Sequence, residues 1–178
     1  MRRKNTTSDM MKGYMAEAFL MLMEKKDYTD ISISEITAKA GVNRSTFYRN
    51  FNSKNEIIKY YFKQIIYKHY FSVSPESTSI PNYLLEMFTH YYGYKKELLL
   101  MHRANVTHII LEALNETFSA IHTDTTVESH YATRYHTGGI YNVFLLWFEG
   151  GMKETPAEIT KITCSYYPSN LRPYMWLK

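Results

Sequence analysis

The segment "RSTFYRN", from residue 44 to residue 50, carries the densest set of side chains with recognisable binding chemistry. Its six polar members are Arg44, Ser45, Thr46, Tyr48, Arg49 and Asn50. Such side chains bind nucleic acids: arginine pairs with guanine, asparagine pairs with adenine, and hydroxyl groups reach phosphates. Phe47 and Phe51 are four residues apart and therefore share one face of a helix. The pattern predicts a short helix that is anchored by its phenylalanines and presents a polar face.

A second short helix is predicted directly before this segment, within "SISEITAKAG". Ser32 and Glu35 have the spacing of a capping box at its start, and Gly41 can adopt the positive φ that ends it. Val42 then begins a tight turn, and Asn43 is a suitable N-cap for the next helix. Two short helices joined in this way form a helix-turn-helix, whose second helix enters the major groove of DNA.

Two longer helices are predicted on either side of this pair. The first runs from about Ser8 to Lys25 and follows a basic arm, "MRRKN". The other starts at a second capping box, Ser53 with Glu56, and continues to about residue 71. For the basic arm, a solubilising tail and a tether to DNA remain open.

The run "ISISEITAKAGVNRSTFYRNFNSKNEII" resembles the DNA-binding signature of the tetracycline-repressor (TetR, AcrR-like) family of bacterial transcriptional regulators. The resemblance covers about residues 8 to 58, and the caps, the glycine and the aromatic residues agree in spacing. It departs from the family pattern at Ser45, where glycine or alanine is frequent, and at Asn50, where histidine or tyrosine is frequent. The operator of a relative therefore cannot be transferred to this chain.

This resemblance assigns roles to single residues. It implies that Arg44, Ser45 and Asn50 face base edges, while Arg49 contacts either bases or phosphates. The phosphate contacts that it implies come from Ser32, Thr46, Tyr48 and Lys54. For Tyr48, a partly buried position in the core is the alternative.

The charge of the chain is concentrated near its start. The formal net charge is +4, and residues 1–54 hold ten of the Lys and Arg residues against six Asp and Glu. The rest of the chain is balanced, so a polyanion is expected to bind the first third. The single cysteine fits a reducing compartment, and the most apolar N-terminal run is too short to span a bilayer. A cytoplasmic protein is expected.

Residues 55–178 are predicted to form a larger helical domain beside a DNA-binding domain at residues 1–54, with the helix of residues 54–71 as connector. The predicted helices are Asn82–Tyr92, Glu97–Arg103, Val106–His122, Glu128–Phe148 and Pro156–Cys164. The fold class is all-α, with about nine helices in total. Gly138 and Gly139 disfavour a helix interior, so either a partner helix approaches closely there or the helix is broken. We favour the close approach.

The family resemblance also implies a homodimer, built by the helices Glu128–Phe148 and Pro156–Cys164, and an effector pocket in the larger domain. The segment "WFEGGMKETPAEITKI" is similar to the end of a subgroup that includes regulators of dihydroxyacetone kinase operons. At least one kind of member in that subgroup acts through a partner protein.

Fourteen of the 17 tyrosines lie beyond residue 54, where they suit either packing between helices or an effector pocket. Core packing is the leading interpretation. The candidate pocket residues are Tyr91, Met101, His102, Tyr135, Tyr141, Phe144 and Trp147. Two pairs, Glu86 with His90 and His108 with Glu112, have the spacing of helical metal ligands, which leaves a zinc-responsive regulator as an alternative. No cofactor and no metal site are assigned.

The function that follows is that of a ligand-responsive repressor, which binds a palindromic operator as a homodimer and releases it when an effector binds. A co-regulator that acts through a partner protein or a small metabolite is the alternative. An enzyme is not expected, because a glycine-rich phosphate loop and a nucleophile elbow are both missing from the sequence.

Overall fold

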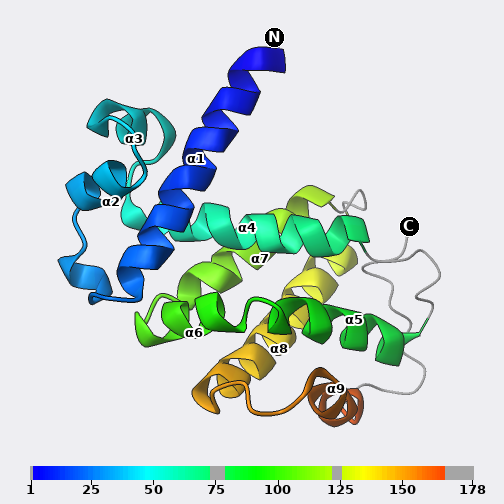
Figure 1. Ribbon diagram of the computed structural model, residues 1–178. Helices are drawn as coiled ribbons and strands as arrows, with labels where there is room; N and C mark the ends of the chain where they lie inside the picture. Colours follow the sequence, from blue (N-terminus) through cyan, green and yellow to red (C-terminus); the bar gives the residue numbers. More distant parts are fainter. Residues whose placement is uncertain (1, 73–78, 122–125, 167–178) are drawn as a thin grey trace.

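The computed structural model describes residues 2–72, 79–121 and 126–166, and in these ranges every regular element is helical (Figure 1). The all-α prediction is therefore confirmed. The elements are α1 (Arg2–Met23), a 3-10 turn η1 (Tyr28–Asp30), α2 (Ile33–Lys39), α3 (Arg44–Asn50), α4 (Lys54–Ser72), α5 (Ile80–Tyr92), α6 (Lys95–Arg103), α7 (His108–Ile121), α8 (Val127–Glu149) and α9 (Pro156–Cys164).

The largest departure from the predicted boundaries is at the start of the chain. Helix α1 begins at Arg2, so the prediction of a basic arm ahead of the helix is wrong. Arginine and lysine favour helices, and no proline or glycine interrupts the chain before Gly13. The remaining boundaries lie close to the predicted ones, and α9 has the predicted bounds.

Local hydrogen bonds explain where the short helices begin and end. At the start of α2 the Glu35 amide donates to Ser32 Oγ (3.2 Å) and the Ser32 amide donates to Glu35 Oε2 (2.9 Å), which completes the predicted capping box. Gly41 has a φ of +67°, which favours glycine at the end of this helix. Asn43 occupies the N-cap position of α3, although its side chain makes no cap hydrogen bond.

The predicted capping box at the start of α4 is only half formed. The Glu56 amide donates to Ser53 Oγ at 3.4 Å, as expected. The Glu56 carboxylate, however, accepts from the backbone and side-chain nitrogens of Asn52, each at 2.9 Å. The reciprocal bond thus begins one residue earlier than predicted.

One hydrophobic cluster runs from the first helices into the larger helical body. Near α1 to α3 it includes Phe19, Phe47 and Phe51, the residue that follows α3. Phe62 of α4 continues it towards Trp147 of α8. Helix α4 packs against α1 and also against α7, as Figure 1 shows, so it connects the two regions. Burying each such side chain stabilises the fold by about 1.5–3 kcal/mol.

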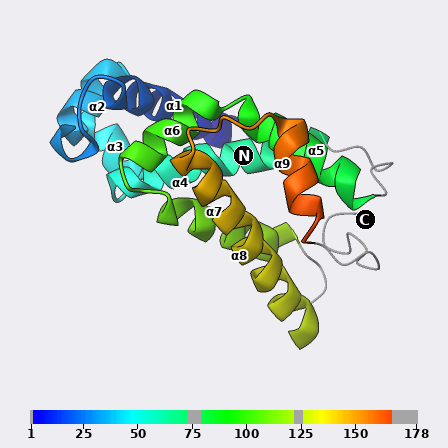
Figure 2. The same cartoon turned by 90° about the horizontal axis from the view of Figure 1, so that it is seen from below.

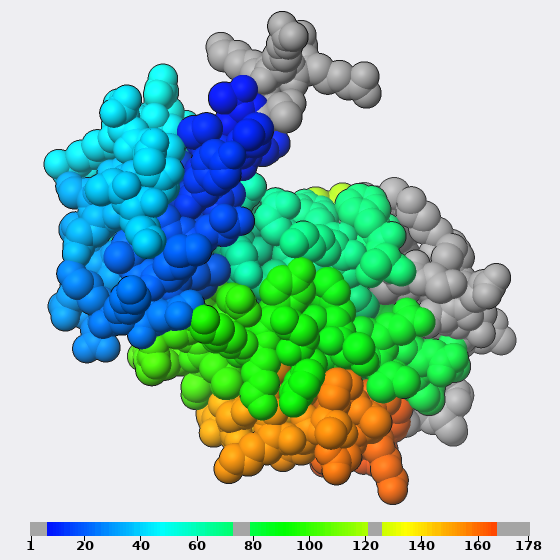
Figure 3. All heavy atoms as spheres, in the orientation of Figure 1, coloured from blue at the N-terminus to red at the C-terminus, as the bar shows by residue number. Residues whose placement is uncertain are grey.

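The arrangement leaves two parts prominent at the surface. Helices α2 and α3 stand out from the body beside α1 (Figure 3). The N-terminal half of α8 extends away from the other helices (Figure 2). Helix α9 packs on α5, and α8 packs on α7 and α6. We call helices α1 to α3 the reading head. The reading head and the exposed helix α8 position the candidate sites.

Candidate nucleic-acid interface and effector cavity

Helix α3 separates its anchor from its polar face as the sequence predicts. Phe47 is completely buried, whereas Arg44, Ser45, Tyr48 and Arg49 are exposed. Tyr48 has 53% of its surface exposed and rests edge-on against Phe47, with ring centroids 5.2 Å apart. Its position favours the surface role over the partly buried one. Thr46 is half-buried on the flank of this helix.

The two arginines of α3 are held by neutral neighbours. Arg44 Nη2 donates to the Tyr48 hydroxyl at 3.1 Å, and its guanidinium lies 5.7 Å from the centre of the Tyr48 ring. Arg49 Nη2 donates to Thr46 Oγ1, also at 3.1 Å. Because these partners are uncharged, the contacts orient the arginines and leave their positive charge to attract phosphates or guanine.

Asn50 differs from the other residues of α3 that are predicted to bind DNA. Its amide oxygen accepts a hydrogen bond from Ser8 of α1 at 2.6 Å, and its amide nitrogen donates to the Thr46 carbonyl at 2.7 Å. These two bonds leave Asn50 one lone pair on its oxygen and one N–H proton for a base, and they fix the orientation in which it could offer them. Its contact with Ser8 joins α3 to α1 through two residues that are 42 positions apart in the chain.

Lys54, a predicted phosphate contact, also has partners within the protein. Its ammonium group donates to the carbonyl oxygens of Tyr28 and Ile31, each at 2.7 Å. The Thr29 carbonyl lies farther away, at 3.4 Å. Burial lowers the pKa of Lys54 from its ordinary value, while the negative charges of nearby carboxylates oppose this shift.

Ser32 is exposed at the start of α2, where a phosphate could reach it. Its hydroxyl donates to Glu35 Oε2 at 2.8 Å. The Glu35 carboxylate also accepts from Lys26, and the hydrogen bonds from Lys26 and Ser32 lower its pKa to about 2. The capping box is therefore ionised at neutral pH and holds the Ser32 side chain in place.

Two supporting residues, Ser8 and Tyr28, were missed by the sequence analysis. Each contacts a predicted DNA-binding residue from another helix or loop, at a separation of 42 residues for Ser8 and 26 for Tyr28. No local spacing rule relates positions so far apart. Only the packing of α1 and the η1 loop against α3 and α4 brings them together.

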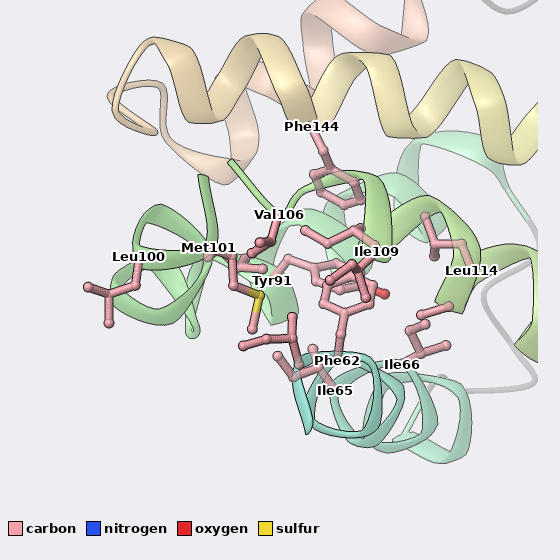
Figure 4. Packing of buried hydrophobic residues seen from close by; sticks show 14 of the residues in the cluster. Phe62, Ile65, Ile66, Tyr91, Leu100, Met101, Val106, Ile109, Leu114 and Phe144 are labelled. Carbon is pink, nitrogen blue, oxygen red and sulfur yellow. The ribbon is translucent and has the colours of Figure 1, made fainter. Parts of the chain in front are cut away.

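A small, mainly apolar cavity of about 20 Å³ lies in the helical body. This is room for roughly one water molecule. Tyr91 and Phe144 of the predicted pocket residues line it, and the cavity residues that were missed are His69, Tyr83, Met87, Leu114, Phe118, His136, Thr137 and Ile140. Much of this lining has helical spacing: positions 83, 87 and 91 lie on one face of α5, and positions 136, 140 and 144 on one face of α8. Figure 4 shows Tyr91 of α5, Leu114 of α7 and Phe144 of α8 among the packed core side chains.

The other five predicted pocket residues do not line this cavity. Met101 and Trp147 are buried in the core, and Trp147 Nε1 donates to the Glu154 carbonyl at 3.1 Å. His102 and Tyr141 are half-buried, while Tyr135 is 88% exposed on α8. The residue type alone does not indicate which face of each helix lines the cavity.

His69 is a buried polar residue of the cavity wall, with 8% of its surface exposed. Its Nε2 is buried and has no hydrogen-bond partner among the described residues. Burial, together with the neighbouring His90, lowers the pKa of His69 to about 4, and burial does the same for His136. Both imidazoles are therefore neutral at pH 7, and this cavity suits an uncharged molecule.

The predicted metal-ligand pairs have other contacts. His90 Nε2 lies 2.9 Å from the Ile65 carbonyl oxygen and must donate to it, because a carbonyl oxygen only accepts. Glu112 forms an ion pair with Lys59 at 2.9 Å. Over the described part of the chain, no three His, Cys, Asp or Glu side chains come together as a metal site would require.

The exposed face of α8 carries large apolar side chains. Tyr131, Tyr135 and Leu146 are 76%, 88% and 71% exposed. The helix continues unbroken through Gly138 and Gly139, so a helix break is excluded. Apart from its chain neighbours and the nearby backbone of α8, a Cβ atom added at either glycine would meet no atom within 4 Å. The predicted close approach thus has no partner within the described chain.

The family comparison matches residues 17–61 to the model described as bacterial regulatory proteins, tetR family. This range contains η1, α2 and α3 and parts of α1 and α4.

Within the described ranges, the helices fall short of the length and apolar character that crossing a membrane requires.

Two relatives match by sequence. One is an uncharacterized HTH-type transcriptional regulator, YxbF of Bacillus subtilis (strain 168), 44% identical over 46 residues. The other is DhaS of Lactococcus lactis subsp. lactis (strain IL1403), the HTH-type activator of the dhaKLM operon, 30% identical over 89 residues. These matches cover 25% and 50% of this chain, but only 12% and 40% of the relatives.

Two solved structures share the fold along most of the chain. The dihydroxyacetone kinase operon activator DhaS superimposes with a TM-score of 0.55 at 19% identity, covering 87% of this chain and 90% of its own. The TetR family repressor AlkX from Dietzia sp. strain DQ12-45-1b, implicated in the biodegradation of n-alkanes, superimposes with a TM-score of 0.50 at 16% identity, covering 86% and 92%. The larger helical body therefore has the fold of these regulators as well.

Proposed function

We propose that this protein, which has the helix-turn-helix segment and the all-helical fold of the TetR family of bacterial regulatory proteins, is a sequence-specific DNA-binding transcriptional regulator of the cytoplasm. The observation that carries the proposal is the exposed face of α3, where two arginines and a tyrosine stand on a buried phenylalanine anchor. Arg44, Ser45 and Asn50 are proposed to meet base edges, with Arg49 at a base or a phosphate. The proposed phosphate-binding residues are Ser32, Thr46, Tyr48 and Lys54. Each is proposed either to contact a phosphate itself or to position the groups that do.

The active form is proposed to be a homodimer. The apolar face of α8, with Tyr131, Tyr135 and Leu146, offers a surface to a second copy, and Gly138 and Gly139 permit two backbones to approach closely. In this proposal α9 contributes from its place on α5. Two reading heads in such a dimer would enter successive major grooves, about 34–36 Å apart, on a palindromic site.

An effector is proposed to act through the cavity between α4, α5, α7 and α8. Its lining is aromatic and aliphatic apart from a few polar groups, which favours an uncharged molecule that donates to or accepts from His69 Nε2. The cavity is small, so a larger effector would have to separate the helices. Such a molecule would favour a body conformation different from the one described, which is the requirement for a change in DNA affinity.

Direct contacts between the body and the reading head support this coupling. Arg103 Nη2 of α6 donates to the Met23 carbonyl at the end of α1 (2.8 Å), and Lys96 pairs with Glu24 (2.7 Å). On α4, Lys59 pairs with Glu112 and Glu116 of α7. A movement of α6 would therefore displace the end of α1, and a movement of α7 would displace α4, which packs against α1.

Repression is proposed as the direction of regulation, with effector binding releasing the operator. Activation is the second candidate, because the relative DhaS, whose match covers 50% of this chain, is described as an activator. A promoter fused to a reporter separates the two: deleting the gene raises expression from a repressed promoter and lowers it from an activated one.

The proposal is tested by selecting duplexes from a random-sequence library with the purified protein, at two salt concentrations and with competitor DNA. A regulator recovers one palindromic sequence and binds it with strong salt dependence. Recovery of no sequence, or salt-sensitive binding to every sequence alike, would overturn the assignment. The alternative co-regulator would instead retain one partner protein in stoichiometric amount.

A further inference from the structure

We propose that Lys54 is a positioning residue that locks the loop between α1 and α2 and so sets the start of α2, rather than a residue that binds a DNA phosphate itself. The proposal deepens the DNA-binding function proposed above and rests on it. Its basis is the environment of the Lys54 ammonium group at the first turn of α4.

The ammonium group is surrounded by backbone oxygen atoms of one short loop. It donates to the carbonyls of Tyr28 and Ile31 at 2.7 Å each, with the Thr29 carbonyl at 3.4 Å. An ammonium group has three protons, so these oxygen atoms fill its donor capacity. The same group lies 4.7 Å from the centre of the Tyr28 ring, which adds a cation–π contact.

A second bond from the next residue of α4 holds the same loop. The Tyr28 hydroxyl donates to the side-chain oxygen of Asn55. The Tyr28 ring also packs against Phe19 of α1, with centroids 5.6 Å apart. Lys54 and Asn55 therefore tie the start of α4 to the end of α1 through one loop.

The loop leads directly into the part of α2 that is proposed to meet DNA. Ile31 is 1% exposed and immediately precedes Ser32, the N-cap of α2. A cation that fixes the Ile31 carbonyl thus fixes the place where α2 begins. Helix α2 in turn packs against α3, so an error at this point would move the recognition helix.

Reaching a phosphate would require Lys54 to leave these oxygens. Two of its three hydrogen bonds are partly buried, and carbonyls that lose a cationic partner in such a place lose a charge-assisted bond. A direct phosphate contact would have to replace both bonds. If Lys54 keeps these hydrogen bonds and acts by positioning α2, it does not have to exchange them.

The test compares Lys54→Met, which keeps the length of the side chain but removes its charge, with Lys25→Met. Lys25 is an exposed lysine in the turn after α1 and controls for the loss of one charge in the same region. The DNA is a duplex selected by the wild-type protein from a random-sequence library. For each protein, the affinity is measured over a series of salt concentrations.

A positioning role predicts that Lys54→Met binds the duplex roughly ten-fold more weakly or worse, with a salt dependence equal to that of Lys25→Met. Hydrogen exchange of the free protein should become faster across residues 28–36 in Lys54→Met and stay unchanged in Lys25→Met. A direct phosphate contact predicts instead that the slope of log K against log salt falls by about one relative to Lys25→Met, with unchanged hydrogen exchange. That result would overturn the proposal.

A measurement on the unaltered protein covers the case in which Lys54→Met does not fold. The protons of the Lys54 ammonium group should exchange slowly with water in the free protein, and its ¹⁵N chemical shift should stay the same when the duplex is added. Rapid exchange, or a large shift on binding, would contradict the proposal. If the wild-type protein selects no duplex, the proposed function fails, and the exchange measurements still decide whether Lys54 holds the loop.

Discussion

Ser8 in α1 donates a hydrogen bond of 2.6 Å to the amide oxygen of Asn50, the last residue of α3. Asn50 also donates to the Thr46 carbonyl, so its amide group links the recognition helix to the first helix. Its position in the sequence suggests a base contact, whereas its bonds suggest that it sets the angle of α3. Stability and base preference therefore separate these two roles.

Replacing Asn50 with alanine is expected to lower the free energy of unfolding by about 1–2 kcal/mol, because the change removes two internal hydrogen bonds. Ser8→Ala should lower it by less, and the double variant should show coupling between the two positions. Urea unfolding measures all three, with Ser34→Ala as an exposed serine control. A changed base preference in Asn50→Ala but not in Ser8→Ala would identify Asn50 as a base-reading residue instead.

Arg44→Ala is expected to relax the choice of base at one operator position by about 1–3 kcal/mol, the usual contribution of a bidentate arginine. The protein should keep most of its affinity for unrelated DNA, because other basic and hydroxyl groups remain. Selection from a randomised operator library measures the effect for Arg44→Ala and for Lys25→Ala as the control. Unchanged discrimination in Arg44→Ala would remove this residue from the base-reading set.

Tyr48→Ala is expected to weaken binding to all sequences, because it removes the hydroxyl that could reach a phosphate and that now accepts from Arg44. Folding should change by no more than about 0.5 kcal/mol, as for other surface positions, since Tyr48 is half exposed. Tyr48→Phe, which keeps the ring, serves as the matched variant. A loss of unfolding free energy above about 2 kcal/mol would show that Tyr48 acts mainly as a core residue.

Acidification is expected to destabilise the helical body between about pH 6.5 and pH 4. In the folded protein the pKa of His69 and that of His136 are lowered to about 4 by burial, whereas an unfolded histidine keeps a pKa near 6.5. Between these values the unfolded chain binds more protons than the folded protein. The free energy of unfolding therefore decreases as the pH is lowered, and the contribution of these histidines levels off below about pH 4. Each unit of pKa difference contributes about 1.4 kcal/mol.

Urea unfolding from pH 7.5 to pH 5 tests this expectation above the range in which the Glu35 carboxylate titrates. His69→Gln should show a shallower dependence on pH than the wild-type protein. His108→Gln, which changes an exposed histidine of α7, is the matched control for the substitution itself. Equal slopes for the wild-type protein and His69→Gln would contradict the expectation.

Gly139→Leu is expected to dissociate the proposed dimer without harming the protomer. The space beside Gly139 is empty in the described chain, so the added side chain meets no neighbour there. It would instead occupy the space needed by a second α8. Sedimentation velocity should give a monomer at concentrations at which the wild-type protein is dimeric.

Two further variants control the dimer experiment. Ala120→Leu adds the same side chain to an exposed position of α7 and should not change the assembly. Gly139→Ala should raise the stability of an isolated protomer by roughly 0.5–1 kcal/mol through helix propensity alone. A wild-type protein that sediments as a monomer, or a Gly139→Leu variant that remains dimeric, would exclude this face of α8 as the interface.

The sequence by itself determined the elements whose signals are local. Ser32, Glu35 and Gly41 mark the ends of α2 by hydrogen bonds and backbone freedom within a few residues, and Phe47 and Phe51 mark the buried side of α3 by helical spacing. These signals predicted the all-helical class and the helix-turn-helix, together with an exposed polar face on α3. The domain division, the dimer and the DNA contacts remain predictions.

The tertiary structure decided what each polar or aromatic side chain faces. The sequence predicts that Asn50 and Lys54 both contact DNA. In the structure Asn50 is bonded to Ser8, and Lys54 is bonded to the carbonyls of Tyr28 and Ile31, partners that come from distant parts of the chain. In the same way, Tyr91 reaches the cavity while Tyr135 points to solvent. Helical spacing tells which residues share a face, but only the packing of whole helices decides which face becomes enclosed.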